Sequence, residues 1–140
     1  LIPPPRTPER LAWNYWLHAA EGSAMPPLLL KLVFSALPGR APGLLRGLVK
    51  SIAARAEAGF IDPQLTTLFD YWEGVLSRTE WFAGPEFTAA DIMMSFPIEA
   101  AADRAGALNG RPRLAAFLQK IHARPAYKRA LEKGGPYAYA

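Results

Sequence analysis

The segment Thr88-Ala89-Ala90-Asp91, followed by an apolar run, constrains the fold of this chain more than any other feature. The Thr88 hydroxyl is placed to accept a hydrogen bond from the amide of Asp91, whose carboxylate reaches back to the amide of Thr88. The following apolar residues cover most of a helix circumference: Ile92, Met93, Met94, Phe96 and Ile98. Because a helix buried all round cannot use water for its first amides, its own sequence must supply the partners. We predict a central buried helix with Thr88 and Asp91 as its structural cap; a catalytic carboxylate at Asp91 is the minor alternative.

Helical spacing of apolar residues recurs along the rest of the chain, and no segment shows the alternation of a strand. Thr7-Pro8-Glu9 combines a cap, a proline and an acid, as a helix start does. We expect a kink or break at Met25-Pro26-Pro27, a loop over residues 38–43 and a helix end at Gly59. The pattern predicts an all-α fold, a bundle of five to seven helices. Residues 1–6 are interpreted as a stiff linker, 7–136 as the helical domain and 137–140 as a loose tail.

Composition excludes several classes of function. The 140 residues suffice for one domain, and no apolar run approaches the ~18 residues of a membrane span. The chain has no cysteine, so it holds no disulfide, catalytic thiol or thiolate metal site, which fits a cytoplasmic location. Its only histidines, His18 and His122, lie 104 residues apart and have no evident third ligand, so we expect no metal. Neither a dinucleotide fingerprint nor a phosphate loop occurs.

Basic residues are scattered, although the net charge is +4. A mild cluster at Arg40, Arg46, Lys50 and Arg55 is interpreted mainly as a solvated helix face, with a phosphate or lipid surface site as the alternative. Our main expectation is therefore that neither nucleic acid nor membrane is a partner. The alternative predicts binding that falls steeply with salt.

Three motifs in this order resemble the all-helical C-terminal domain of cytosolic glutathione S-transferases, above all the bacterial and fungal members. They are WLHAAEGS at residues 16–23, WFAG at 81–84 leading to FTAAD at 87–91, and RPAYKRA at 124–130. Together they span residues 16–130, most of the chain. The FTAAD box alone would carry little weight, whereas its combination with the flanking motifs is fairly specific.

The resemblance implies a function for a longer protein. Family members begin with a thioredoxin-like domain that supplies the catalytic Ser, Tyr or Cys and nearly all glutathione contacts. This chain starts in what resembles the linker after that domain, so we expect no catalytic residue in it and no activity of the 140 residues alone. In the full-length protein the resemblance implies a detoxifying, cytoplasmic homodimer. That dimer would use glutathione as co-substrate for conjugation to small electrophiles or for peroxide reduction.

The first helix is the best place to look for a binding site. One broad side of it carries Tyr15, His18, Ala19, Gly22, Ser23 and Met25. Gly22 and Ser23 are poor helix formers, and such small residues permit close approach of a ligand or of another backbone. The resemblance implies that this helix lines the electrophile pocket and contributes to the dimer, so two interpretations stay open, an electrophile-binding surface and close packing at a dimer interface. By the resemblance, Glu21 is a candidate to reach the ammonium of glutathione across the dimer, and a plain surface carboxylate is the equal alternative.

Tyrosines near the end of the chain have simpler interpretations. We interpret Tyr127 as a packing residue with a tethered hydroxyl, whereas Tyr137 and Tyr139 belong to the tail or cap the pocket. A second hypothesis for the whole chain is a non-catalytic protein-interaction module of the same fold. The coding sequence upstream of Leu1 discriminates between that module and the enzyme.

Overall fold

The computed structural model describes residues 1–139, which form α-helices and short helical turns with no β-strand beyond one isolated bridge between Trp81 and Gly84. The α-helices are α1 (Pro8–Ala19), α2 (Met25–Arg40), α3 (Arg46–Ala56), α4 (Asp62–Leu76), α5 (Ala89–Ala105), α6 (Pro112–Ala123) and α7 (Pro125–Gly134). The predicted all-α fold is confirmed. The predicted start at Thr7 is also confirmed, because its hydroxyl accepts from the amide of Arg10 at 3.2 Å.

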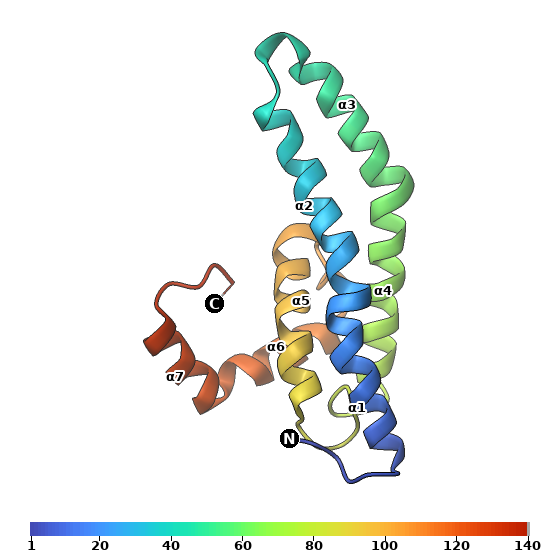
Figure 1. The fold of residues 1–140 in the computed structure, drawn as a ribbon, viewed down its shortest axis with the longest axis vertical. Helices are drawn as coiled ribbons and strands as arrows, with labels where there is room; N and C mark the ends of the chain where they lie inside the picture. Colours follow the sequence, from blue (N-terminus) through green and yellow to red (C-terminus); the bar gives the residue numbers. More distant parts are fainter. Residues whose placement is uncertain (140) are drawn as a thin grey trace.

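Two long rods run side by side along the molecule (Figure 1). The π-helical turn η1 (Ala20–Ala24) joins α1 directly to α2, and the π-helical turn η3 (Glu57–Ile61) joins α3 directly to α4. The irregularity expected at Met25-Pro26-Pro27 takes the form of a π-turn that ends just before Met25 and not of a break, whereas the expected helix end at Gly59 is wrong. Each rod continues through the position where a break was predicted.

A proline follows both π-turns at the same distance from a glycine within the turn. In an α-helix the N–H of each residue donates to the carbonyl four residues earlier, and proline has no N–H to donate. Pro26 stands four residues after Gly22, and Pro63 stands four residues after Gly59. A π-turn pairs residues five apart, which moves the carbonyls away from the proline ring without ending the helix. Both turns thus place a glycine four residues before a proline.

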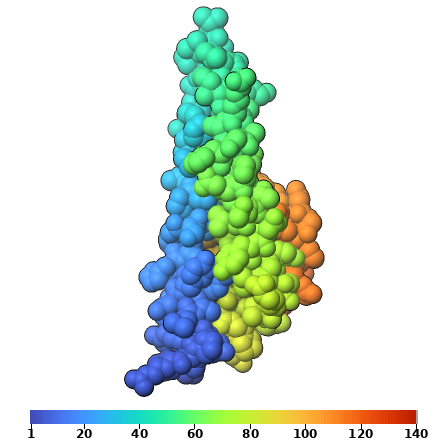
Figure 2. Space-filling model, turned by 90° about the vertical axis from the view of Figure 1, so that its right-hand side faces the viewer, coloured from blue at the N-terminus to red at the C-terminus, as the bar shows by residue number. Residues whose placement is uncertain are grey.

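The far end of the two rods is a helical hairpin. The helix α2 includes Pro38 and ends at Arg40, so the loop predicted from residue 38 begins later than expected. The 3₁₀ turn η2 (Gly43–Leu45) then leads into α3. The hairpin reaches beyond the other helices and narrows to a tip in the space-filling view (Figures 1 and 2).

The core lies at the opposite, wider end, where α5 contacts α1 and α6, and α4 contacts α6. The largest fully buried side chains include Trp72, Phe82, Met94 and Phe117. The prediction that α5 is buried all round is wrong, because Ile92 is 51% exposed and Phe96 is 40% exposed. The apolar surface of α5 is wider than the part that its neighbours in this chain cover.

Polar contacts hold the layers together. Both carboxylate oxygens of Glu73 on α4 accept from the first amides of α6, at 3.0 Å from Arg113 and 2.9 Å from Leu114. The ammonium of Lys31 on α2 lies 2.8 Å from both Glu57 and Asp62. Within residues 1–139, no helix has the length and apolarity that crossing a membrane requires.

Candidate functional site

An open trough on α1 and η1 collects most of the side chains that the sequence analysis singled out. The cavity measures about 460 Å³ and is lined by Asn14, Tyr15, His18, Ala19, Gly22 and Ser23. Ala19 is buried at 8% exposure, whereas His18, Gly22 and Ser23 are exposed. The structure thus brings five of the six candidate substrate residues to one surface, and adds Asn14, which the sequence analysis missed.

Tyr15 is the main hydroxyl at the trough. It is 49% exposed, and its ring packs edge-on against Trp16 at 4.9 Å and against Tyr71 of α4 at 6.5 Å between ring centroids. Burial raises the pKa of Tyr71 above its ordinary value, and the neighbouring Tyr15 raises it further. The Tyr71 phenol therefore remains protonated at neutral pH and can donate a hydrogen bond, and the exposed Tyr15 hydroxyl is placed to meet a ligand in the trough.

The π-turn supplies an acceptor beside the trough. The residues four and five positions after Gly22 are Pro26 and Pro27, so neither can donate to the Gly22 carbonyl. A side chain added at Gly22 would meet no atom within 4 Å, which leaves open space around this backbone. The trough therefore combines a phenol, an imidazole and an approachable main chain, a set suited to orienting a small partly polar ligand.

Two of the predicted residues do not line this trough. Met25 is half-buried and packs against the core. Glu21 is exposed and lies outside the cavity lining. Within residues 1–139, the His, Asp and Glu side chains form no group of three or more that could hold a metal ion.

Hydrogen bonds within the chain satisfy the polar groups at the start of α5. The Asp91 carboxylate accepts from the amide of Thr88 at 2.7 Å, from its hydroxyl at 3.0 Å and from the amide of Phe82 at 2.9 Å. The amide of Ala90 donates to the Thr88 hydroxyl at 3.2 Å, and that of Ala89 to the carbonyl of Leu1 at 3.0 Å. Burial raises the pKa of Asp91, although these hydrogen bonds act in the opposite direction. Every oxygen of this carboxylate is engaged within the chain, so it is poorly placed to act on a ligand.

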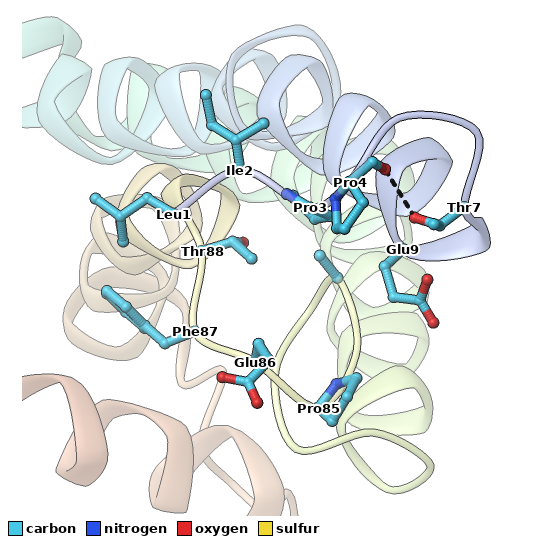
Figure 3. Close-up of a pocket in the computed structure, with 11 residues that line it drawn as sticks. Leu1, Ile2, Pro3, Pro4, Thr7, Glu9, Pro85, Glu86, Phe87 and Thr88 are labelled. Atoms are coloured by element: carbon cyan, nitrogen blue, oxygen red, sulfur yellow. Dashed lines mark hydrogen bonds between the residues drawn. The ribbon is translucent and has the colours of Figure 1, made fainter.

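A second cavity of about 440 Å³ lies between the N-terminal segment and the loop before α5 (Figure 3). Leu1, Ile2 and the first prolines form one wall, and the loop from Pro85 to Thr88 forms the other. The Thr7 hydroxyl donates to the carbonyl of Pro4 at 3.0 Å, which closes one end. The lining is mainly apolar, and among the described lining residues no histidine lies beside its two carboxylates, Glu9 and Glu86.

A buried carboxylate on α5 was missed by the sequence analysis. Glu99 is 4% exposed, lies 2.8 Å from His122 Nε2 and accepts from the hydroxyls of Tyr127 at 3.0 Å and Tyr137 at 2.5 Å. The tethered hydroxyl predicted for Tyr127 is confirmed. Burial and the Glu99 carboxylate raise the pKa of Tyr127 to about 12. The one local sequence signal for this site was an acidic residue, Glu99, within an otherwise apolar stretch of helix.

Residues of the tail expected to be loose take part in these contacts. Besides the bond from Tyr137 to Glu99, the Tyr139 ring meets Phe96 of α5 edge-on at 6.0 Å. The guanidinium of Arg104 lies over the same ring, 5.4 Å from its centroid. The tail therefore folds back along α5 and covers part of its exposed face.

Comparison with known proteins assigns the family. A family profile described as "Glutathione S-transferase, C-terminal domain" matches residues 46–134. The chain belongs to the glutathione S-transferase family. The resemblance drawn from the three motifs is thereby confirmed, and the helical bundle is the C-terminal domain of that family.

Individual glutathione S-transferases show the same relation. Glutathione S-transferase 1 of Saccharomyces cerevisiae is 28% identical over 123 residues, which are 86% of this chain and 53% of the relative. Glutathione S-transferase 3 of Schizosaccharomyces pombe is 29% identical, over 86% of this chain and 50% of the relative. A solved glutathione S-transferase from Actinobacillus pleuropneumoniae superposes with a TM-score of 0.72 at 26% identity, covering 95% of this chain and 54% of that one. The chain thus spans about half the length of the curated relatives it matches.

Proposed function

We propose that this chain is the electrophile-binding and dimer-supporting helical domain of a glutathione transferase. The family assignment supports glutathione as the co-substrate of the complete protein. The observation that carries the site is the convergence of Tyr15, His18 and Gly22 on one open trough. In this proposal the residues of this chain position the electrophile, whereas the thiol is activated outside them.

The chemistry of the trough supports this division of work. Tyr15 donates a hydrogen bond to a polar substituent of the electrophile, and the buried Ala19 gives an apolar floor. No group in the trough is a nucleophile with an adjacent base within hydrogen-bond reach, which agrees with a catalytic group supplied by another domain. A homodimer and a cytoplasmic location belong to the same proposal.

The test begins with the mass of the natural gene product and its activity. We expect a protein longer by a small domain, with glutathione conjugation to an activated aryl chloride, and no conjugation by the 140 residues alone. In the longer protein, Tyr15→Phe and Gly22→Val are expected to change the ratio of kcat/KM between bulky and small electrophiles. Leu11→Ala is the control, because Leu11 is 74% exposed on the same helix and lies outside the trough.

Each outcome has a definite consequence. An unchanged substrate profile in both trough variants removes the trough from the site. A natural product without a preceding thioredoxin-like domain and without conjugation favours the non-catalytic interaction module of the same fold.

A further inference from the structure

The hairpin tip, defined as residues 37–52, forms the narrow end of the molecule (Figure 2). Several of its leucines are exposed. Leu44 in the turn η2 is 96% exposed, Leu48 is 62% exposed and Ile52 is 57% exposed. Leu44 thus has almost no contact within the described chain. Scattered single apolar residues on a surface are ordinary, whereas several at one projecting end indicate a docking surface.

The same segment is basic and has no acid. Between Glu21 and Glu57 the sequence contains five Lys or Arg residues and no Asp or Glu. One of the five, Lys31, is paired with Glu57 and Asp62. The other four are exposed and take part in no ion pair within residues 1–139: Arg40, Arg46, Lys50 and Arg55. The tip and the helix just below it therefore combine four unpaired cations with exposed leucines.

In place of the solvated helix face that was our main expectation from the sequence, we propose the alternative, that the hairpin tip docks on an anionic lipid surface. An anionic surface attracts several neighbouring Lys and Arg side chains at once, and apolar side chains between them enter the boundary between headgroups and acyl chains. The turn with Leu44 meets the bilayer first, and Arg46 and Lys50 on α3 lie behind it. Because the tip lies at one extreme of the long axis, a bilayer reaches it without touching the wide base (Figure 1).

Other occupants fit these observations less well. Two copies meeting tip to tip would bring six unpaired cations together, three from each tip, and the like charges would repel. A nucleic-acid backbone would satisfy the cations, but Leu44 and Leu48 would gain little from contact with phosphates. The lipid surface alone uses both the charge and the exposed leucines.

The experiment measures co-sedimentation of the natural gene product with vesicles. One set is phosphatidylcholine alone, and the other contains about a third phosphatidylserine. The main variant is the triple Arg40→Gln, Arg46→Gln, Lys50→Gln. Its matched control is Lys128→Gln, Arg129→Gln, Lys133→Gln, which removes the same charge from exposed positions on α7. Leu44→Gln tests the apolar part, and circular dichroism shows that each variant remains helical.

We expect binding to the anionic vesicles only, weakening as salt rises from about 50 to 200 mM. Each cation removed from the tip is expected to weaken binding about fivefold, so the tip triple loses roughly a hundredfold. Leu44→Gln is expected to lose about tenfold. The α7 triple is expected to change binding much less.

Three results would overturn the proposal. One is equal loss in the tip and α7 triples, which would indicate net charge rather than a site. Another is tighter binding to duplex DNA than to vesicles, with no effect of Leu44→Gln, which would favour a nucleic acid. The last is absence of vesicle binding together with a monomer–dimer equilibrium that shifts in Leu44→Gln, which would make the tip a contact between copies.

Discussion

The wide base and the hairpin tip are both rich in apolar residues, but these residues are buried at the base and exposed at the tip. At the base Trp72 and Phe82 are each 2% exposed, whereas at the tip Leu44 is 96% and Leu48 62% exposed. The base has a third layer, because α5 and α6 contact the two rods there; at the tip α2 and α3 contact mainly each other. Two helices bury one stripe each, so apolar residues on their remaining faces stay in solvent. Burial is therefore decided by the number of neighbouring layers and not by the apolar content of the segment.

The largest expected effect comes from a large core side chain. Trp72→Ala is expected to lower the free energy of unfolding by about 3–5 kcal/mol, because it leaves a cavity in the base. Its counterpart at the tip, Leu48→Ala, is expected to change it by less than about 0.5 kcal/mol. Urea unfolding of both variants checks the comparison. A comparable loss in the two variants would mean that the tip is packed as tightly as the base.

The sealed start of α5 gives the next effect. Asp91→Ala is expected to cost about 1–3 kcal/mol, because it leaves the amides of Phe82 and Thr88 without an acceptor. Asp103→Ala on the exposed side of the same helix is the control and is expected to cost much less. Thermal melting of both variants makes the measurement. If Asp91→Ala melts with the parent, the cap does not stabilise the buried helix start.

Replacing a glycine is expected to have a smaller effect on stability, and this effect also differs between the base and the hairpin tip. Gly106 ends α5 with φ of +63°, and an added Cβ would lie 2.7 Å from the Asn109 side-chain nitrogen. Gly106→Ala is therefore expected to cost about 1–2 kcal/mol. At the tip, Gly43→Ala meets no atom within 4 Å and is expected to be nearly neutral. Equal unfolding midpoints in urea would contradict this difference.

The smallest expected effect is a loss of unfolding free energy at alkaline pH. The pKa of Tyr127 is raised to about 12 in the folded chain, so the folded state keeps a proton that the unfolded state loses near pH 10. Stability from this group is complete below about pH 10 and is lost as pH rises toward 12. Tyr127→Phe is expected to make the loss of unfolding free energy across this range less steep. An identical slope in the variant and the parent would show that Tyr127 does not contribute. The tip contains no tyrosine and brings no such dependence.

Local signals in the sequence predicted the helix starts well. Thr7 with Pro8, and Thr88 with Asp91, act within a few residues of each other, so their geometry follows from the sequence alone. A kink or break at Met25-Pro26-Pro27 and a helix end at Gly59 were predicted because proline and glycine weaken a helix, and only the structure shows that a π-turn keeps the helix continuous at both joints. The uncovered face of α5 was missed for another reason, since residue pattern gives the width of an apolar face but not its neighbours.

For the candidate site too, the sequence predicted what depends on local spacing and missed what depends on contacts between distant segments. Tyr15, His18 and Gly22 lie together because helical spacing places them on one side. Met25 comes just after the π-turn, where that spacing no longer holds, and it packs on the core instead. The contacts of Glu99 join α5 to α6, α7 and the tail, and no local pattern reveals contacts between such distant segments.

The two π-turns also set the direction in which remote side chains face. Each residue of an α-helix advances the chain by about 100° around its axis, and a π-turn closes over one residue more than an α-turn. Removing one residue from η1 would rotate α2 by roughly that angle while leaving its own sequence intact. The orientation of Leu37 and Arg40 is thus fixed more than ten residues away. A single deletion or insertion at such a joint offers a way to re-aim the whole hairpin without touching its surface.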